Sequence, residues 1–493
     1  MKLRQRSLAI FIGCSLFAAA PIASMAQDLG DYTTLQQIIY AFSPPGADNP
    51  VTPAQRLGTY PLTENPAGFQ DGFDPKVYDQ WQTIQLGPET GAICGNGSPY
   101  KFFIMRSHTS GNMSIYEEGG GACTDYASCT GGTLLSARNP NGIPDNYMSI
   151  SDLSAYEVSP FVTRNNAIVD ALELGIFLAA GASSYVSSVP TPTVKTQAWN
   201  LVYVPYCTGD IYSGDKVAIY NDPSGKNPPL VWHHNGLRNE RAVVGWLKDH
   251  MPRPKQMLSV GCSAGGVGSL TSYGARRPDM APNLSYLIDD SGPIFHAPLN
   301  GDPAQYPSIP LHTSIRAAWG LDAPNGPLAF MQQRLPQVDL NDMGSIYPAL
   351  SAQFPGDHLG HTGFWQDLDF SAYSYEPYYP QIANAPDEAT RDALLHQFWA
   401  IDTGHLRDQL SGQNNFGGYF PQYRSLNESH CSTIVDFNNG DIQEQGLQLV
   451  DFINSVLNEN AGPVLHASET SPAADYAKPD NPAYDFVNTL LNN

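Results

Sequence analysis

The sequence predicts an α/β fold, in which helices cover both faces of a mostly parallel sheet. Two observations lead to this prediction. Short apolar runs alternate along the chain with segments whose apolar residues have helical spacing. Strands that alternate with helices form parallel sheets, because each crossover lays a helix on one face. The 44 glycines and 41 prolines add many long loops to this core.

Five apolar runs predict strands, and they cover residues 101–107, 113–121, 200–207, 255–261 and 283–290. Residues 236–251 predict a helix, with Leu237, Val243 and Leu247 on one side. Residues 441–459 predict another, with Asp441 as its N-cap. The segment 293–356 is rich in proline and aromatic residues, and we interpret it as a long loop-rich insertion or cap.

Three regions divide the chain. Residues 1–26 form a predicted signal peptide, with three cations, an apolar run and small residues before Gln27. Residues 27–460 form a single catalytic domain, and residues 461–493 a polar, proline-rich tail. No later apolar run reaches the roughly 20 residues that a membrane span needs. We therefore expect a secreted or periplasmic protein that acts as a monomer.

The net charge of −22 becomes more negative once the three signal-peptide cations are removed. Nucleic acids and anionic membranes bind clustered Lys and Arg, so we expect neither as a partner. Six cysteines follow the signal peptide, an even number that favours disulfides in an exported protein. Cys123 and Cys129 are close enough to bridge one loop, while the pairing of Cys94, Cys207, Cys262 and Cys431 stays open. A zinc site is the rival interpretation, but the chain has no CxxC pair.

Ser263 is the candidate nucleophile. It stands in GCSAGG, after the apolar run MLSV and before a segment that can form a helix. A strand, a sharp turn and a helix are the context of the nucleophile elbow, and small neighbours suit its strained backbone. Without this context GxSxG is a weak signal, and Ser263 would be one residue of a glycine-rich turn.

Backbone amides must stabilise the oxyanion that forms when a serine attacks an ester. The loop IYEEGGGACTD supplies Gly120 and Gly121 directly after a predicted strand. Ala264, the residue after the candidate nucleophile, supplies the third amide.

A histidine must take the proton of the serine, and a carboxylate must orient that histidine. Serine, acid and histidine follow each other in this order in hydrolases with the elbow, which favours a late histidine. His430 precedes an apolar run that predicts a strand, whereas His396 and His405 have helical surroundings. For the acid, Asp367 is preferred and Asp369 stays open. Asp289 and Asp290 are expected to support the site by hydrogen bonds.

Four stretches together resemble the pectin acetylesterase and Notum family of secreted serine carboxylesterases: GCSAGG, EEGGGACTDYASC, YVPYCTGDIYSGD and the late HC at His430. The resemblance spans about residues 94–437. It implies an α/β-hydrolase-like fold, a Ser/Asp/His triad and no cofactor. It also places Ser263 as nucleophile, His430 as base, and Gly120, Gly121 and Ala264 in the oxyanion hole. Family members often carry a tryptophan where Gly121 and Ala122 stand here, so the acyl pocket is expected to differ.

The leading hypothesis is hydrolysis of short acyl esters, with acetyl esters on plant polysaccharides as the expected substrates. Arg276, Arg277 and Arg424 are the few cations near the motifs, so we expect a neutral or weakly charged carrier in preference to pectin. Two alternatives stay open: a non-catalytic carbohydrate-binding protein, and an esterase for lipid or polyester acyl chains. A pair of glycosidase carboxylates, Glu117 and Glu118, is disfavoured because adjacent strand residues point to opposite faces.

Overall fold

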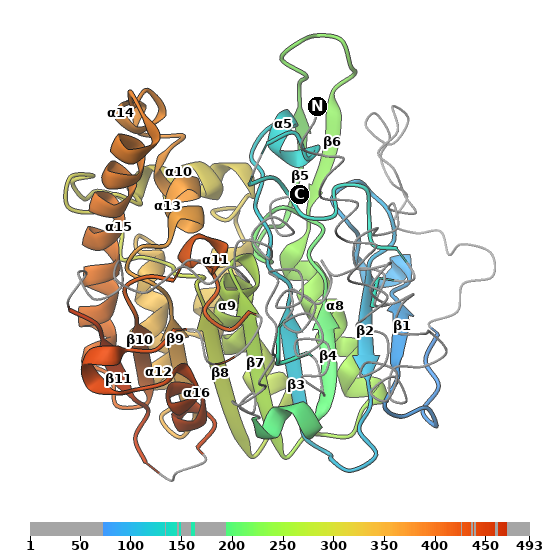
Figure 1. The fold of residues 1–493 in the computed structure, drawn as a ribbon. Coiled ribbons are helices and arrows are strands. Elements are labelled where there is room, and N and C mark those ends of the chain that lie inside the picture. Colours follow the sequence, from blue (N-terminus) through green and yellow to red (C-terminus); the bar gives the residue numbers. More distant parts are fainter. Residues whose placement is uncertain are drawn as a thin grey trace, which may run out of the picture.

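A nine-stranded sheet forms the centre of the protein in the computed structural model (Figure 1). The structure describes residues 72–470, except 134, 145–146, 149–158, 163–193, 425, 435–436, 438–439 and 459–461. The predicted signal peptide and most of the predicted tail lie outside this part. The strands follow the order β1-β2-β4-β3-β7-β8-β9-β10-β11. Their bounds are Trp81–Gln85, Lys101–Met105, Asn200–Val204, Met113–Glu117, Gln256–Cys262, Leu284–Asp290, His358–Thr362, Phe416–Phe420 and His466–Ser468 in that order.

Strand directions confirm the mostly parallel sheet. From β4 to β11 every neighbouring pair is parallel, whereas β1 pairs with β2, and β2 with β4, in antiparallel fashion. The carboxyl ends of the parallel strands therefore meet at one edge. Strand β7 lies between β3 and β8, so the residues that follow these three strands come together at the middle of that edge.

Helices cover both faces of the sheet, as predicted. Leu287 in β8 packs into one apolar cluster with residues of α9 and α15. Its neighbours Tyr286 and Ile288 pack into another cluster with residues of α16. Within the described residues, the α-helices are α5 (Tyr126–Cys129), α8 (Gly236–His250), α9 (Ala264–Met280), α10 (Ile309–Ala318), α11 (Pro327–Arg334), α12 (Ile346–Gln353), α13 (Leu368–Tyr375), α14 (Pro380–Ala383), α15 (Glu388–Ser411) and α16 (Leu449–Val456). The 3₁₀ helices are η2 (Pro88–Thr90), η3 (Lys195–Ala198), η4 (Met343–Ser345), η5 (Leu426–Ser429) and η6 (Gln443–Gln445).

A two-stranded hairpin extends from the top of the molecule beside α5 (Figure 1). It consists of β5 (Lys216–Tyr220) and β6 (Leu230–His234), which pair in antiparallel fashion. On one face, Leu230 and Trp232 pack in a small cluster with Cys123 and Cys129. The hairpin thereby buries the loop that follows β3.

The helix predicted for residues 441–459 begins later than expected. Helix α16 starts at Leu449, with Gln448 as its N-cap, so the prediction of Asp441 as the cap is wrong. The residues before it form η6, which ends at Gly446 with a φ of 61°, and a bridge between Ile442 and Leu447. A turn that needs this left-handed glycine cannot continue into a helix. In the part of the chain that the structure describes, no helix is both long and apolar enough to cross a bilayer.

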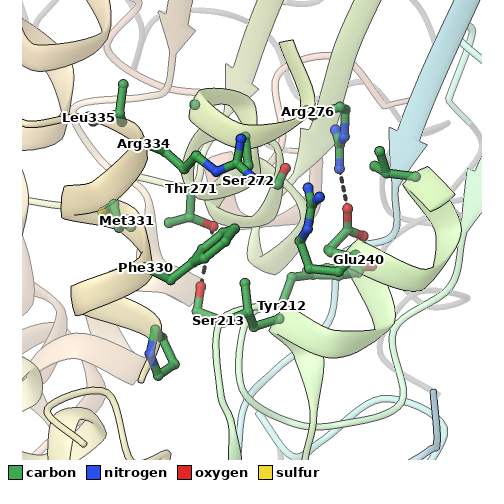
Figure 2. Close-up of a pocket in the computed structure, with 16 residues that line it drawn as sticks. Tyr212, Ser213, Glu240, Thr271, Ser272, Arg276, Phe330, Met331, Arg334 and Leu335 are labelled. Atoms are coloured by element: carbon green, nitrogen blue, oxygen red, sulfur yellow. Dashed lines mark hydrogen bonds and ion pairs between the residues drawn. The ribbon is translucent and has the colours of Figure 1, made fainter. Parts of the chain in front are cut away.

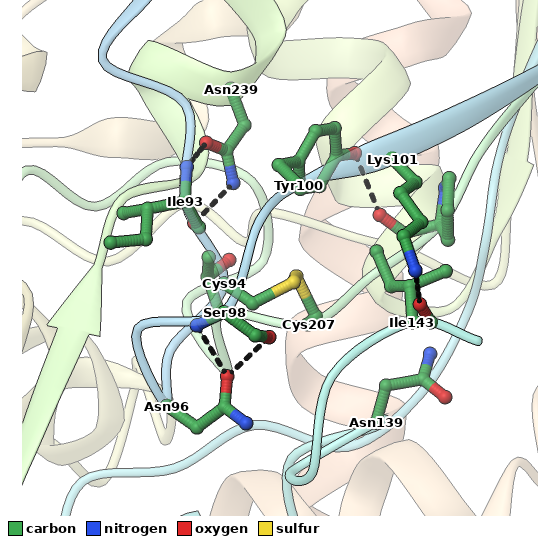
Figure 3. The surroundings of a disulfide bond; sticks show 12 residues. Ile93, Cys94, Asn96, Ser98, Tyr100, Lys101, Asn139, Ile143, Cys207 and Asn239 are labelled. Carbon is green, nitrogen blue, oxygen red and sulfur yellow. Dashed lines mark hydrogen bonds between the residues drawn. A yellow bond between two sulfur atoms is a disulfide. The ribbon is translucent and has the colours of Figure 1, made fainter. Parts of the chain in front are cut away.

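The disulfide Cys94–Cys207 joins the segment before β2 to the loop after β4 (Figure 3). Asn239 in α8 holds the same region by hydrogen bonds with the backbone nitrogen and oxygen of Ile93, at 2.9 and 3.0 Å. The loop after β4 begins with the stretch PYCTGD, residues 205–210, at the sheet edge next to the loop after β3. The bond therefore fixes one wall of the region where the candidate site residues lie.

Candidate active site

Ser263 lies between β7 and α9 in the conformation of a nucleophile elbow. Its φ of 56° and ψ of −122° are strained for a residue with a side chain. Its backbone N–H donates to the carbonyl oxygen of Asp290 at 2.8 Å, which ties the turn to the end of β8. A Cβ atom on Gly265 would lie 1.9 Å from the carbonyl oxygen of Glu117, so only glycine fits at this position in the first turn of α9. The small residues of GCSAGG thus let the elbow press against β3.

The predicted oxyanion residues lie at the same sheet edge as Ser263. Gly120 and Gly121 follow β3, the neighbour of β7, and Ala264 is the first residue of α9. The first amides of a helix have no partner within the helix, so Ala264 offers its N–H at a positive helix end. Gly120 has a φ of 146°, and a Cβ atom there would lie 2.7 Å from the Arg138 side chain. Glycine is required at that position for both reasons.

Several groups hold the loop after β3. The predicted disulfide between Cys123 and Cys129 is confirmed. The indole of Trp319 donates to the carbonyl oxygen of Cys123 at 2.8 Å, and the N–H of Cys123 donates to Gly209 at 2.8 Å. The hydroxyl of Tyr212 donates to the carbonyl oxygen of Glu118 at 2.7 Å. The glycines therefore belong to a fixed loop, as preorganised donors require.

The structure brings His430 together with Asp367. Nδ1 of His430 donates to Oδ2 of Asp367 at 2.7 Å, and both side chains are buried. Asp367 is also the N-cap of α13, since its Oδ1 accepts from the N–H of Phe370 at 2.9 Å. This second bond fixes the carboxylate in place. Asp369, the alternative acid, is the second residue of α13. Among the described hydrogen bonds, none joins its carboxylate to the imidazole of His430.

A disulfide between Cys262 and Cys431 joins the residue before Ser263 to the residue after His430. A ring nitrogen of His430 lies within 4.8 Å of both sulfur atoms. Among the described hydrogen bonds, none joins Ser263 to His430 directly. In hydrolases without bound substrate this bond is often long and closes only with the substrate.

The loop that carries His430 is held by two charged groups. The carboxylate of Asp290 accepts from the backbone N–H of Ser432 at 2.8 Å and of Thr433 at 2.7 Å. The guanidinium of Arg424 donates to the carbonyl oxygens of His430 and Cys431, at 3.0 and 2.7 Å. The predicted strand after His430 is wrong, because Ser432 to Ile434 form turns and bends. Loop residues that bond to these two groups cannot also join a sheet.

Electrostatics favour the protonated form of His430. Burial lowers the pKa of the imidazole, but the charge and hydrogen bond of Asp367 and the charges of Asp369 and Asp290 outweigh burial and raise the pKa to about 9. Burial raises the pKa of Asp369 to about 7, so this carboxylate becomes charged near neutral pH. The imidazole is thus a stronger base than an ordinary histidine, whose pKa is about 6.5.

The pH dependence of activity should follow this pKa. A general base acts in its neutral form, so a pKa near 9 predicts that kcat/KM rises with pH up to about pH 9. An ordinary histidine would give a rise through roughly pH 6 to 7. Hydrolysis of p-nitrophenyl acetate between pH 6 and 10, corrected for the rate without enzyme, measures the profile. A plateau that begins at pH 7 would contradict the expectation.

Sequence reasoning missed a second histidine–aspartate pair. Nδ1 of His361 in β9 lies 2.8 Å from Oδ2 of Asp289, and both residues are buried. Tyr347 donates to the same carboxylate at 3.1 Å, and Gly292 donates its N–H at 3.2 Å. The pair lies against the first turn of α9, because a Cβ atom on Gly266 would be 2.6 Å from Oδ1 of Asp289. Strand pairing aligns Asp289 with His361, a register that sequence alone does not reveal.

Two groups of metal-ligating residue types lie close together in the described part of the chain. One contains Cys123, Cys129 and His234, and the other contains Cys262, His430 and Cys431. In each group the two cysteines are bonded to one another. Zinc binds thiolates, and a sulfur in a disulfide is not one.

A strained serine between strand and helix, glycine amides beside it, and a histidine held by an aspartate form the arrangement found in serine hydrolases. Comparison with known families gives a narrower result. Residues 183–285, which include Ser263, match the model of the pectinacetylesterase family. This match confirms the resemblance to the pectin acetylesterase and Notum family.

Individual relatives agree with the family match. Pectin acetylesterase 5 of Arabidopsis thaliana is 27% identical over 216 residues, which are 43% of this chain and 42% of the relative. The palmitoleoyl-protein carboxylesterase NOTUM of Mus musculus is 22% identical over 239 residues, which are 48% of this chain and 36% of the relative. The matches thus span less than half the length of these curated relatives. The solved Wnt deacylase Notum from Drosophila is similar with a TM-score of 0.46 and 16% identity, and covers 78% of this chain and 94% of its own.

Proposed function

We propose that this protein is a secreted serine carboxylesterase that hydrolyses short acyl esters, with acetyl as the favoured group. One observation carries the proposal. The disulfide Cys262–Cys431 ties the elbow serine, Ser263, to the loop of His430, whose imidazole bonds with Asp367. The family match over residues 183–285 and the described disulfides of an oxidising compartment support it.

In the proposed reaction, Oγ of Ser263 attacks the ester carbonyl carbon while Nε2 of His430 takes its proton. Hydrogen bonds from the amides of Gly120, Gly121 and Ala264 stabilise the negative charge that develops on the carbonyl oxygen. The intermediate breaks its bond to the alcohol oxygen, which receives the proton from His430. The same imidazole then takes a proton from water, whose oxygen attacks the acyl carbon. The bond from this carbon to Oγ of Ser263 breaks, His430 returns the proton to Oγ, and the carboxylic acid leaves. No cofactor enters these steps.

Charges around the site support a neutral carrier for the acyl group. The three arginines that sequence places near the motifs are all engaged. Arg276 is 1% exposed and paired with Glu117, and Arg277 is paired with Asp357. Arg424 is buried against the loop carbonyls. A polygalacturonate chain needs accessible cations, so an acetylated neutral polysaccharide fits this site better than pectin.

Two other functions are tested by the same experiment. A non-catalytic carbohydrate-binding protein would release no acetate, and an esterase for lipid or polyester chains would prefer long acyl groups. The experiment measures acetate released from acetylated xylan and acetylated pectin, at 20 mM and 500 mM salt, and hydrolysis of p-nitrophenyl esters with acyl chains of two to sixteen carbons. We expect the fastest rates on acetyl esters, and xylan rates that salt does not change. Faster release from pectin at low salt, falling as salt rises, would contradict the neutral carrier.

A further inference from the structure

Two adjacent carboxylates, Glu117 and Glu118, lie at the end of β3 just before the glycine loop, and the proposed reaction uses neither. Both are fully buried. Glu118 accepts from the backbone N–H of Tyr206 at 2.8 Å, in the loop after β4. Glu117 bonds instead with Arg276 in α9. Because the two side chains bind partners on different elements and point to opposite sides of the strand, they cannot flank one glycosidic bond.

Arg276 joins four elements of the fold. Its Nη2 donates to Oε1 of Glu117 in β3 at 2.7 Å, and its Nη1 donates to Oγ of Ser259 in β7 at 3.1 Å. It also donates to Glu240 in α8, a bond drawn in Figure 2. The same figure places Arg276 and Glu240 at a cavity of about 40 Å³ between α8, α9 and α11.

The free energy of unfolding alone does not explain why Arg276, Glu117 and Glu240 are buried together. Burial raises the pKa of Glu117 well above its usual range, the charge of Arg276 opposes this rise, and the charge of Glu240 adds to it. Two buried carboxylates therefore share one guanidinium, and the protonated form of Glu117 is favoured. Apolar residues of similar volume often stabilise a fold as well as a buried ion pair does, whereas some polar clusters fix one particular geometry.

This pair connects the two segments that carry the predicted oxyanion amides. Glu117 precedes Gly120 by three residues on one side, and Arg276 belongs to the helix that begins at Ala264 on the other. The backbones already touch there, since a Cβ atom on Gly265 would lie 1.9 Å from the carbonyl oxygen of Glu117. We propose that Glu117 and Arg276 are a positioning pair that sets the spacing between the glycine-loop amides and the amide of Ala264.

This inference rests on the proposed esterase function and makes a kinetic prediction. Oxyanion donors bind the transition state more strongly than the substrate, so a displaced donor lowers kcat and leaves KM nearly unchanged. For Arg276→Met we expect kcat to fall by about tenfold to a hundredfold, with KM within about twofold, because one lost donor costs about a hundredfold or more. Arg276→Lys keeps the charge but not the forked geometry and should lose less.

The experiment measures kcat, KM and the thermal midpoint with p-nitrophenyl acetate, and the affinity for a short alkyl boronic acid, which forms a tetrahedral adduct with a catalytic serine. The variants are Arg276→Met, Arg276→Lys and the double variant Glu117→Gln/Arg276→Met, which removes the charge of Glu117 so that two buried carboxylates no longer face each other without the guanidinium. Arg277→Met is the matched control, because it removes the neighbouring arginine of α9 and its 2.7 Å bond to Asp357 without touching β3.

We expect the double variant to regain thermal stability relative to Arg276→Met but to keep the low kcat, with boronic acid affinity reduced by a similar factor. Arg277→Met should lose stability and retain kcat. A double variant with wild-type kcat, or kcat losses that follow the thermal midpoint in every variant including Arg277→Met, would overturn the inference. A wild-type protein without Ser263-dependent hydrolysis would overturn the proposed function as well.

Discussion

Replacing Ser263 by alanine should lower kcat/KM for p-nitrophenyl acetate by about a thousandfold or more, a loss of at least about 4 kcal/mol of transition-state stabilisation. The reason is that only the Oγ atom can form the acyl-enzyme, whereas the oxyanion amides remain and leave a residual rate. The thermal midpoint should change little, because alanine at this position has the same backbone strain at φ 56° as serine.

A matched control for this variant is Ser269→Ala. Ser269 lies in α9, the helix that follows Ser263, and is fully buried, and its hydroxyl donates to the carbonyl oxygen of Gly266 at 2.9 Å. It should change activity by less than about threefold, since it does not touch the reacting atoms. Equal rates for wild-type protein and Ser263→Ala, in preparations free of contaminating esterase, would place the activity elsewhere.

Asp367→Asn should lower kcat by about a thousandfold at pH 7. The carboxylate accepts the Nδ1–H of His430 and so leaves Nε2 free to take the proton of the serine. An asparagine amide can donate to Nδ1 instead, which places the proton on Nε2 and blocks the base. The loss of the negative charge also lowers the pKa of His430, because Asp367 is the largest of the groups that raise it.

The measurement is kcat against pH for Asp367→Asn, with Asp369→Asn as the control. The control removes a carboxylate two residues away and should keep most of the activity, while its pH profile shifts to lower pH because Asp369 also raises the pKa of His430. If Asp369→Asn caused the larger loss, the acid would be Asp369, and the 2.7 Å bond of Asp367 would serve only to hold the loop.

Residues with local signals could be found from the sequence. Ser263 was identified because a strand, small neighbours and a helix all lie within a dozen residues of it. The pairing of Cys123 with Cys129 can be predicted because the two residues are only six positions apart. The five predicted strands appear as β2, β3, β4, β7 and β8, because their apolar runs are buried on both faces of the central sheet.

Features that depend on distant contacts could not be found in this way. The bond between Cys262 and Cys431 spans 169 residues, and nothing near either cysteine indicates its partner. The choice between Asp367 and Asp369 depends on which carboxylate faces the imidazole once α13 has formed. Arg276 looks like an ordinary surface arginine in the sequence, since arginine is almost never fully buried without a partner. Its burial follows from two glutamates, 36 and 159 residues away.

In the proposed reaction, Ser263 carries the acyl group during turnover. The measurement that tests it most directly is mass spectrometry of the protein quenched in acid during hydrolysis of p-nitrophenyl acetate, and of the protein treated with a fluorophosphonate. We expect one acetyl group, or one phosphonyl group, on the peptide that contains Ser263, and none on the Ser263→Ala protein. Label on another residue, or hydrolysis of the ester with Ser263 unlabelled by both reagents, would contradict it.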